Sequence, residues 1–405
     1  MPASRFGPLA LREFRLLFLG RLVSNLGTAM TEVALIFAVL DVYRSSAALG
    51  LVLASAAIPG VALILLGGVL ADRWPRRNLM IGGELIGFVG QGLLAALLLV
   101  GAAPLWAMAV LSALTGLGGA FLFPAMTGLV PETVPAAQLQ QANALRGLYV
   151  STSAIVGPAI AGVLVATAGP GWAIAADAAT FGLGALFLAR LRVGRTALPS
   201  GETMVRALVL GWDTFRSRTW LWVDVVRSSL WHAVPLAGFL VAGAVVAKAS
   251  LGGAPAWAAI QSTAGVGAVI GALVALRLRP RRPLIAANLA ISLYALPLAL
   301  LAARTPLWVV CLGALPGGIG VPVFSALWTT TLQREVAPDV LSRVSAFQVL
   351  GSHALLPVGL AVAGPLVAVV GAAPVLWVGA AYVLGSGAVV LALPSVRGLT
   401  APAAV

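Results

Sequence analysis

The strongest constraint on this chain is a series of apolar runs, each about as long as a bilayer is thick. A membrane-spanning helix needs roughly 20 apolar residues, and polar or Gly/Pro segments divide the chain into twelve such runs. Only 9% of the 405 residues are charged, against about 25% in a soluble domain. The runs are 17–40, 47–70, 78–100, 104–127, 145–168, 171–190, 219–246, 255–277, 284–303, 307–331, 345–369 and 374–394. The sequence therefore predicts an all-α membrane protein with twelve transmembrane helices.

The segments between the runs differ in their content of basic residues, and this asymmetry predicts the orientation. With the N-terminus inside, the inner segments hold 19 lysine and arginine residues, whereas the outer loops hold three, Arg44, Lys248 and Arg304. Because basic loops stay in the cytoplasm, we expect a multi-pass protein of the inner (plasma) membrane with both termini cytoplasmic. The first run lacks a small-residue cleavage site at signal-peptide distance, so we expect it to be retained.

The two halves of the chain resemble each other at an offset of 202 residues. The tripeptide "PLW" at 104–106 recurs at 306–308, and Gly116 recurs as Gly318. Parallel repeats of six helices are one known plan for a secondary transporter. The sequence predicts two six-helix halves, 1–190 and 219–405, joined by a cytoplasmic linker, 191–218, with a short amphipathic helix.

One short inner loop carries more charge than orientation explains. The stretch "GGVLADRWPRR" contains Gly67, Gly68, Asp72, Arg73, Arg76 and Arg77. Its arginines could act as topology signals alone, but acids contribute little to orientation. The two glycines, one turn before the acid, allow close helix approach. The acid therefore predicts a role beyond topology.

A second motif lies on the fifth run, where "IVGPAIAG" contains Gly157, Pro158 and Gly162. A proline removes one backbone donor and weakens a helix. Two interpretations stay open for this motif: a tolerated kink, which is common in membrane helices, or a bend that shapes the contact with the other half.

These motifs, together with "LVPETVPAAQLQQANAL" (129–145) and "AADAATFGLGALF" (175–187), resemble the major facilitator superfamily over nearly the whole chain. Within it they are similar to the drug-and-siderophore exporter branch, which includes macrolide efflux, enterobactin-exporter-like and transmembrane secretion effector proteins. The resemblance implies a central cavity lined by runs one, four, seven and ten. It also implies that Asp72 helps to latch the halves near the start of run eleven, where a helix N-terminus near Ser345 favours an anion. Run four has no arginine, although many proton-coupled exporters carry one there.

Ionisable side chains inside apolar runs are costly and need an explanation. The candidates for the cavity or for coupling are Arg21, Asn25, Glu32, Asp224, Arg227 and His232. Glu32 lies eleven residues, or roughly 16 Å, beyond Arg21, too far for a direct pair, and we predict that it carries a coupling proton. A structural hydrogen bond is the alternative. Asp224 and Arg227 are three residues apart and can pair with each other.

Three further polar residues are expected to be structural. Glu84 and Asp177 lie on runs three and six, which are peripheral in the resembled fold, so we expect buried hydrogen bonds there. His353 on run eleven is expected to be a satisfied interior histidine.

Several classes of function conflict with the composition. The only lysine, Lys248, lies outside any phosphate-loop pattern, and the two histidines have no acid at metal-ligand spacing. Basic residues form no continuous face for nucleic acid. We therefore expect no enzyme, no cofactor, no metal and no nucleic-acid partner.

The sequence favours a secondary efflux transporter of hydrophobic or amphipathic small molecules, such as drugs, antibiotics or secondary metabolites. We expect proton antiport with alternating access, in a monomer whose partners are the substrate, protons and the lipid bilayer. An importer or facilitator on the same fold is one alternative. A non-transporting sensor or scaffold is another.

Overall fold

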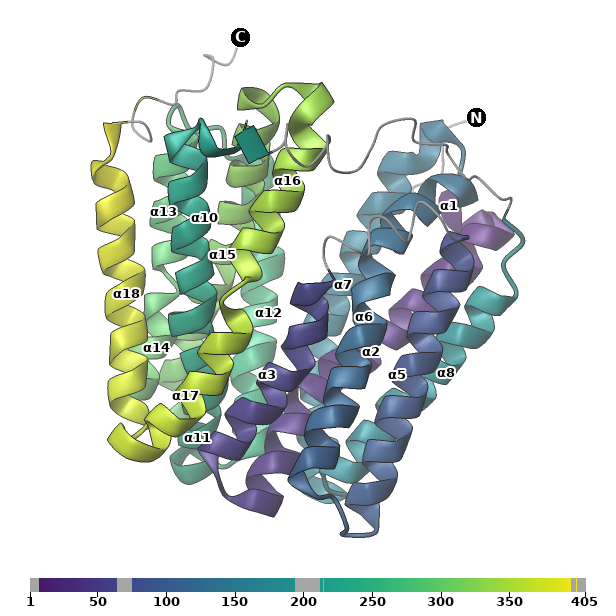
Figure 1. Cartoon of the computed structure of the whole chain (residues 1–405), viewed down its shortest axis with the longest axis vertical. Coiled ribbons are helices and arrows are strands. Elements are labelled where there is room, and N and C mark those ends of the chain that lie inside the picture. The colour runs from purple at the N-terminus through teal and green to yellow at the C-terminus, as the bar shows by residue number, and fades with distance from the viewer. Residues whose placement is uncertain (1–6, 64–74, 194–211, 214, 395–397, 399–405) are drawn as a thin grey trace. The chain divides into compact units, whose positions relative to one another are not determined.

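In the computed structural model, residues 7–63, 75–193, 212–213, 215–394 and 398 are described, and their regular elements are all helices (Figure 1). Eleven helices of this part of the chain are long and apolar enough to cross a membrane. The run predicted at 47–70 is represented by a shorter apolar helix, α3 (Ser46–Ala62), and residues 64–74 lie outside the described residues. The prediction of an all-α membrane protein is confirmed.

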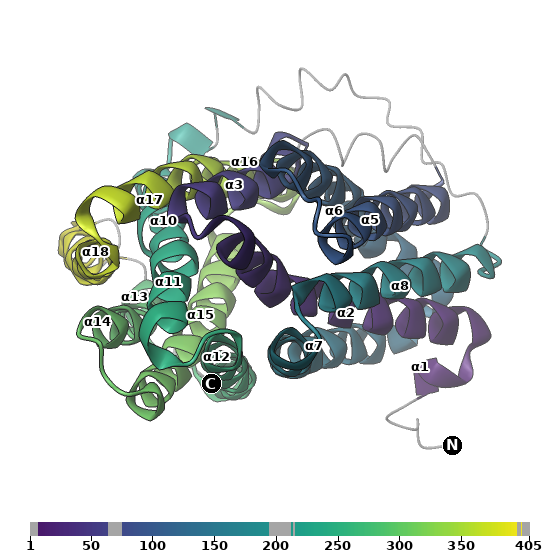
Figure 2. The ribbon, with the colours of Figure 1, turned by 90° about the horizontal axis from the view of Figure 1, so that it is seen from below.

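The chain divides into two compact units. One comprises Met1–Arg44 and Leu51–Pro199, and the other comprises Ser45–Gly50 and Ser200–Val405. The helices up to residue 189 are α1 (Gly7–Ala10), α2 (Arg12–Tyr43), α3, α5 (Arg76–Leu99), α6 (Leu105–Thr133), η1 (Ala136–Gln138), α7 (Leu139–Thr167) and α8 (Pro170–Ala189). Within the first unit, α2 packs against α7 and α8, and α5 packs against α6 and α8 (Figure 2). Most of the predicted linker and its amphipathic helix lie outside the described residues.

The second unit contains more and shorter helices. Its first predicted span, 219–246, consists of α10 (Thr219–Trp231), η2 (His232–Leu236), η3 (Phe239–Gly243), α11 (Ala244–Val246) and η4 (Ala247–Leu251), of which η2, η3 and η4 are π-helical. The others are α12 (Ala254–Arg277), α13 (Pro283–Ser292), α14 (Ala295–Ala302), α15 (Leu307–Glu335), α16 (Pro338–His353), α17 (Leu356–Val370) and α18 (Ala372–Ala392).

Two spans predicted as continuous are interrupted by turns, and a third, Thr219–Leu251, is one helix that changes from α- to π-helical. A proline follows each of these three points. Pro235 comes four residues after Trp231, where α10 ends, and Pro357 comes four residues after His353, where α16 ends. Pro297 stands in the same relation to Leu293, between α13 and α14. A proline ring clashes with the carbonyl four residues before it and has no N–H to donate. In each case the change in the helix thus lies at the residue whose carbonyl would meet the proline ring.

Four exposed tryptophans lie near the start of long helices. Trp106, Trp172, Trp308 and Trp377 are 50–70% exposed, and each lies within the first six residues of its helix. These four helices all begin after segments predicted to lie outside. Tryptophan favours the membrane–water boundary because its ring is apolar and its N–H is polar, so these positions are typical of one edge of a spanning bundle.

The predicted repeat is visible in how the helices cross. On α6, a Cβ added to Gly118 would lie 2.5 Å from the carbonyl oxygen of Gly83 on α5. On α15, a Cβ at Gly320 would overlap the backbone of Ala290 on α13. Both crossings therefore require glycine, and the two glycines are 202 residues apart. Each unit thus uses the same device to bring two backbones together.

Candidate functional site

A polar stripe runs along α2. Arg21, Asn25, Thr28 and Glu32 are spaced by four, three and four residues, which places them on one face of the helix. The first two are partly buried, whereas Thr28 and Glu32 are exposed. Glu32 has no hydrogen bond or ion pair with another described residue. An ionisable group in a membrane helix almost always faces a bundle interior or a water-filled cavity, so this stripe is the candidate transport surface of the first unit.

The stripe begins at a buried ion pair. The Arg21 guanidinium donates to Glu84 on α5 over 2.5 Å, and the Ser24 hydroxyl donates to the other carboxylate oxygen of Glu84 over 2.8 Å. The Glu84 side chain is 0% exposed and that of Arg21 is 13% exposed. A Cβ at Gly184 on α8 would lie 2.7 Å from the same carboxylate. Three helices thus enclose this charge pair, and Glu84 has the structural hydrogen bonds expected of it.

A second buried acid lies between α2 and α8. Asp177 is 0% exposed and accepts hydrogen bonds from the hydroxyls of Thr31, over 2.7 Å, and Thr180, over 3.3 Å. A Cβ at Gly27 would overlap this carboxyl group and the Thr180 side chain. The partners described for Asp177 are neutral, in contrast to those of Glu84. The sequence analysis did not identify Ser24 and Thr31 as the hydroxyl partners of the buried acids. Each of them lies directly before one stripe residue and three positions after another.

The charged inner loop is described only from residue 75 onward. Arg76 donates to the carboxylate of Glu132 over 2.8 Å and to the carbonyl of Gly128 over 3.0 Å, both on α6. Arg77 donates to the carbonyls of Leu188, over 3.1 Å, and Ala189, at the end of α8. Both arginines therefore bind helix C-termini, where a cation is favoured. The other predicted latch residues, Gly67, Gly68, Asp72 and Arg73, lie outside the described residues, and the latch stays a prediction.

The fifth-run motif packs inside its own unit. Gly157 is buried in α7, and an added Cβ there would lie 2.5 Å from the Cβ of Ala29 on α2. Pro158 lies inside α7 without interrupting it, and Gly162 is buried one turn later. The glycine therefore serves close packing against the helix that carries the polar stripe.

In the second unit, Asp224 and Arg227 form the ion pair that their spacing predicts. The Arg227 guanidinium donates to Asp224 Oδ1 from Nε over 3.1 Å and from Nη2 over 2.9 Å. Both side chains are 6% exposed. The guanidinium lies 5.1 Å from the ring centroid of Phe324, and the Tyr382 hydroxyl donates to the Arg227 carbonyl over 2.8 Å. The pair is thus fully enclosed by its own unit.

His232 lies at the junction of α10 and η2. Its ring contacts that of His353 at the end of α16, with 4.3 Å between centroids, and that of Trp231 at 5.1 Å. Trp231 also contacts Tyr294 between α13 and α14, at 5.0 Å. The α-to-π change in the Thr219–Leu251 helix and the two interruptions therefore meet through side chains. His353 hydrogen-bonds its own helix, as expected, but it also faces the second histidine of the chain.

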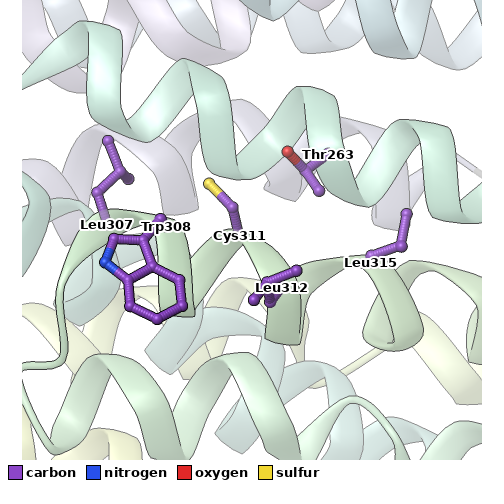
Figure 3. Close-up of a pocket in the computed structure, with 6 residues that line it drawn as sticks. All are labelled: Thr263, Leu307, Trp308, Cys311, Leu312 and Leu315. Carbon is purple, nitrogen blue, oxygen red and sulfur yellow. The ribbon is translucent and has the colours of Figure 1, made fainter.

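An apolar groove lies on α12 and α15, with a volume of about 670 Å³. Figure 3 shows Cys311 and Thr263 between Leu307, Trp308, Leu312 and Leu315. Trp308 and Leu312 are 66% and 62% exposed. A shallow apolar groove beside a boundary tryptophan suits lipid chains. Among the described residues, no cluster of three or more His, Cys, Asp or Glu side chains could hold a metal ion.

The sequence matches a family model described as "Transmembrane secretion effector" over residues 3–315. The macrolide efflux protein A of Streptococcus pyogenes is 26% identical over 368 residues, which cover 86% of this chain and 87% of that protein. The multidrug efflux pump Tap of Mycobacterium tuberculosis is 26% identical over 402 residues, covering 95% and 94%.

Two solved structures show the same fold. The nucleoside transporter NupG has a TM-score of 0.74 at 15% identity and covers 94% of this chain and 98% of its own. A bacterial homologue of the iron transporter ferroportin, in an inward-facing state, has a TM-score of 0.73 at 18% identity and covers 94% and 98%. At these identities the likeness concerns the fold alone.

Proposed function

We propose that this chain, which belongs to the transmembrane secretion effector family of membrane transporters, is a secondary exporter of hydrophobic or amphipathic small molecules. The family confirms the resemblance to efflux transporters that the sequence motifs indicated. Efflux is what the names of the similar proteins from Streptococcus pyogenes and Mycobacterium tuberculosis state of those proteins. We extend efflux to this chain and propose proton antiport with alternating access as its mechanism.

The observation that carries the proposal is the polar stripe of α2. A membrane helix gains nothing from an exposed carboxyl group unless water or substrate reaches it. Asn25 and Thr28 offer hydrogen bonds at neighbouring turns, while the rest of the helix is largely apolar. Such a surface suits a compound that is mostly hydrophobic with a few polar groups, and it disfavours sugars or phosphates.

Glu32 supplies the coupling in this proposal. Its carboxyl group takes up a proton from the outer side and releases it to the cytoplasm, and the two protonation states favour different ligands. One proton moving through about 100 mV supplies about 2.3 kcal/mol. That is enough for roughly a fiftyfold gradient of a neutral substrate.

Export is tested in a host whose own efflux pumps have been deleted. Expression of this chain should raise resistance to some members of a panel of hydrophobic antibiotics and dyes, and should lower the cell content of those compounds. Increased cell content would favour the importer, and no change for any compound would favour the non-transporting sensor.

The role of Glu32 is tested by Glu32→Gln in vesicles. The variant should still exchange substrate down its gradient but should lose uphill export and its dependence on pH. Glu13→Gln, the same change of acid to amide near the start of α2 and outside the stripe, is the matched control and should keep both. Uphill export with wild-type pH dependence in Glu32→Gln would exclude Glu32 as the coupling group.

We further propose that both termini and the 191–218 linker are cytoplasmic, that the protein lies in the inner membrane, and that it acts as a monomer. The asymmetry of basic residues supports the orientation. Reporter fusions after Arg195 and Arg282 should read as cytoplasmic, and fusions near Ala102 and Arg304 as external. Opposite readings at two of these positions would contradict the orientation.

A further inference from the structure

The two histidines of the chain meet where α10 passes into the π-helix η2 and where α16 ends, both in the second unit. The sequence contains no other histidine, and the two rings come from spans more than 100 residues apart. The His232 ring belongs to the first residue of the π-helix η2, and His353 is the last residue of α16. π-helical turns and interrupted membrane helices occur most often at binding sites.

The interruptions are tied together around these rings. The backbone N–H of Leu355, just after the end of α16, donates to the Ser229 hydroxyl of α10 over 3.3 Å. A Cβ at Gly359 on α17 would overlap the backbone of Ala233 in η2, and one at Gly351 would lie 2.5 Å from Val225. Glycines before and after the end of α16 therefore let α16 and α17 lie close to α10 and η2. This close approach holds the two rings in contact.

The hydrogen bonds of the two rings fix which nitrogen of each is available. His232 Nδ1 lies 2.7 Å from the Ser228 carbonyl, and His353 Nδ1 lies 3.0 Å from the Val349 carbonyl. A carbonyl oxygen can only accept, so each Nδ1 carries a hydrogen. In the neutral rings the lone pair is consequently on Nε2.

The distance between the rings limits what they can bind together. Two imidazoles on one zinc ion, with each nitrogen about 2.0–2.1 Å from the metal, would hold their centroids about 5 Å apart. The observed 4.3 Å is shorter, and the two ring planes are tilted by 43°. Two positive rings at this separation repel each other strongly. The geometry therefore suits one positive charge on two rings.

On α10, η2, α17 and α18, the charged residues are Asp224 and Arg227 alone. The titratable and charged residues of the elements packed against the pair are Asp224 and Arg227 on α10, Tyr294 between α13 and α14, Tyr382 on α18, and Asp339 and Arg343 on α16. Asp224 is already paired with Arg227, and the two charged residues of α16 stand at least ten positions before His353. Both histidine side chains are partly exposed, so a proton can reach them.

We infer that His232 and His353 form a binding site for a single proton, shared between the two rings at the interrupted spans of the second unit. The proton comes from water, binds the lone pair of one Nε2 and returns to water, and no other bond forms or breaks. The role of this site in coupling rests on the proposed proton-driven export, whereas proton binding itself does not.

Proton binding can be measured site by site, because labelling the protein with ¹⁵N-histidine and purifying it through a histidine-free tag gives ring signals from this pair alone. We expect the signals of both rings to shift together in one step as the pH is lowered. The second proton should bind at least about tenfold more weakly than the first. In His232→Gln, this shared step should disappear.

Tyr382→Phe removes a hydroxyl from the same unit without touching either ring, and the shared step should persist in it. Two independent titrations in the wild type, each unaffected by loss of the other ring, would overturn the inference. Stoichiometric Zn²⁺ that moved both sets of signals would also overturn it, in favour of a metal site.

The coupling role is measured separately, by transport. If the shared step is present, His353→Gln should flatten the pH dependence of export while leaving substrate exchange intact. An unchanged pH profile would remove the pair from coupling. A chain that exports nothing in any assay would contradict the proposed function, and the titration would still decide whether the pair binds a proton.

Discussion

The two units use the same packing positions but place their polar groups differently. Gly157 on α7 packs against Ala29 of α2, and Gly359, 202 residues later on α17, packs against Ala233 of η2. In the first unit the helices at this crossing are continuous, and the buried acids Glu84 and Asp177 have partners on α2. In the second unit both helices are interrupted or π-helical, and histidines occupy the interruptions.

The comparison distinguishes residues that helix packing requires from polar residues that could form a functional site. Glycines at the crossings recur in both units because backbones must approach closely in either one. Pairing Ala29 with Ala233, an offset of 204, places His232 opposite Thr28 of the polar stripe. Each unit thus carries a polar residue at the same position of its first span, in an α-helix in one and at the start of a π-helix in the other.

The largest effect is expected from removing one partner of the buried ion pair in the first unit. Glu84→Leu leaves the Arg21 guanidinium enclosed without a carboxylate, which should destabilise the protein by about 3–5 kcal/mol. The double variant Arg21→Leu, Glu84→Leu should recover most of this loss. Thermal unfolding in detergent, followed by size-exclusion chromatography, measures both. Glu13→Gln, in a more exposed pair with Arg12, is the control and should cost less than about 1 kcal/mol.

An intermediate loss of stability is expected at the glycine crossing that recurs within each unit. Gly359→Ala should cost about 1–3 kcal/mol, because its Cβ would overlap backbone atoms that cannot move independently. Gly157→Ala meets a single methyl group first and should cost less. Gly385→Ala faces open space on α18 and should be neutral or stabilising, since alanine favours a helix. Equal losses of stability at Gly157 and Gly359 would mean that the backbone beside Gly359 yields as easily as the methyl group beside Gly157.

The smallest effect is expected at the buried acid with neutral partners. Asp177→Asn keeps an oxygen for the Thr31 hydroxyl and leaves no cation unpaired, so the loss of stability should be within about 1 kcal/mol. The same unfolding assay applies, with Glu84→Gln alongside it. A loss at Asp177 as large as that at Glu84 would show that Asp177 needs its negative charge.

The sequence predicted the spans, the repeat and the Asp224–Arg227 pair because each depends on local spacing. It did not predict the interrupted spans, since a hydropathy run continues through them. Proline alone is no guide either: Pro158 in α7 and Pro322 in α15 lie inside continuous helices. What distinguishes the interruption after His353 is a distant partner for the freed backbone, Ser229 bonding Leu355, and such tertiary contacts leave no local pattern.

The partners of the stripe were equally out of reach of sequence reasoning. Arg21 was a candidate for the cavity, yet its carboxylate partner, Glu84, lies 63 positions later on another helix. The separation of Arg21 from Glu32 along the helix excluded Glu32 as its partner but did not indicate Glu84. The position of Glu32 on α2 could be predicted, because it follows from helical periodicity.

The contact of Arg77 with the end of α8 has a consequence for how the chain is made. Its acceptors, the carbonyls of Leu188 and Ala189, follow it by 111 and 112 positions. At a synthesis rate of about 5–20 residues per second, the arginine waits roughly 5–20 s for them. Before α8 is made, the charge of Arg77 can serve as an orientation signal of the kind that keeps basic loops in the cytoplasm. In the folded chain the same guanidinium binds the end of α8, so one side chain can serve both purposes.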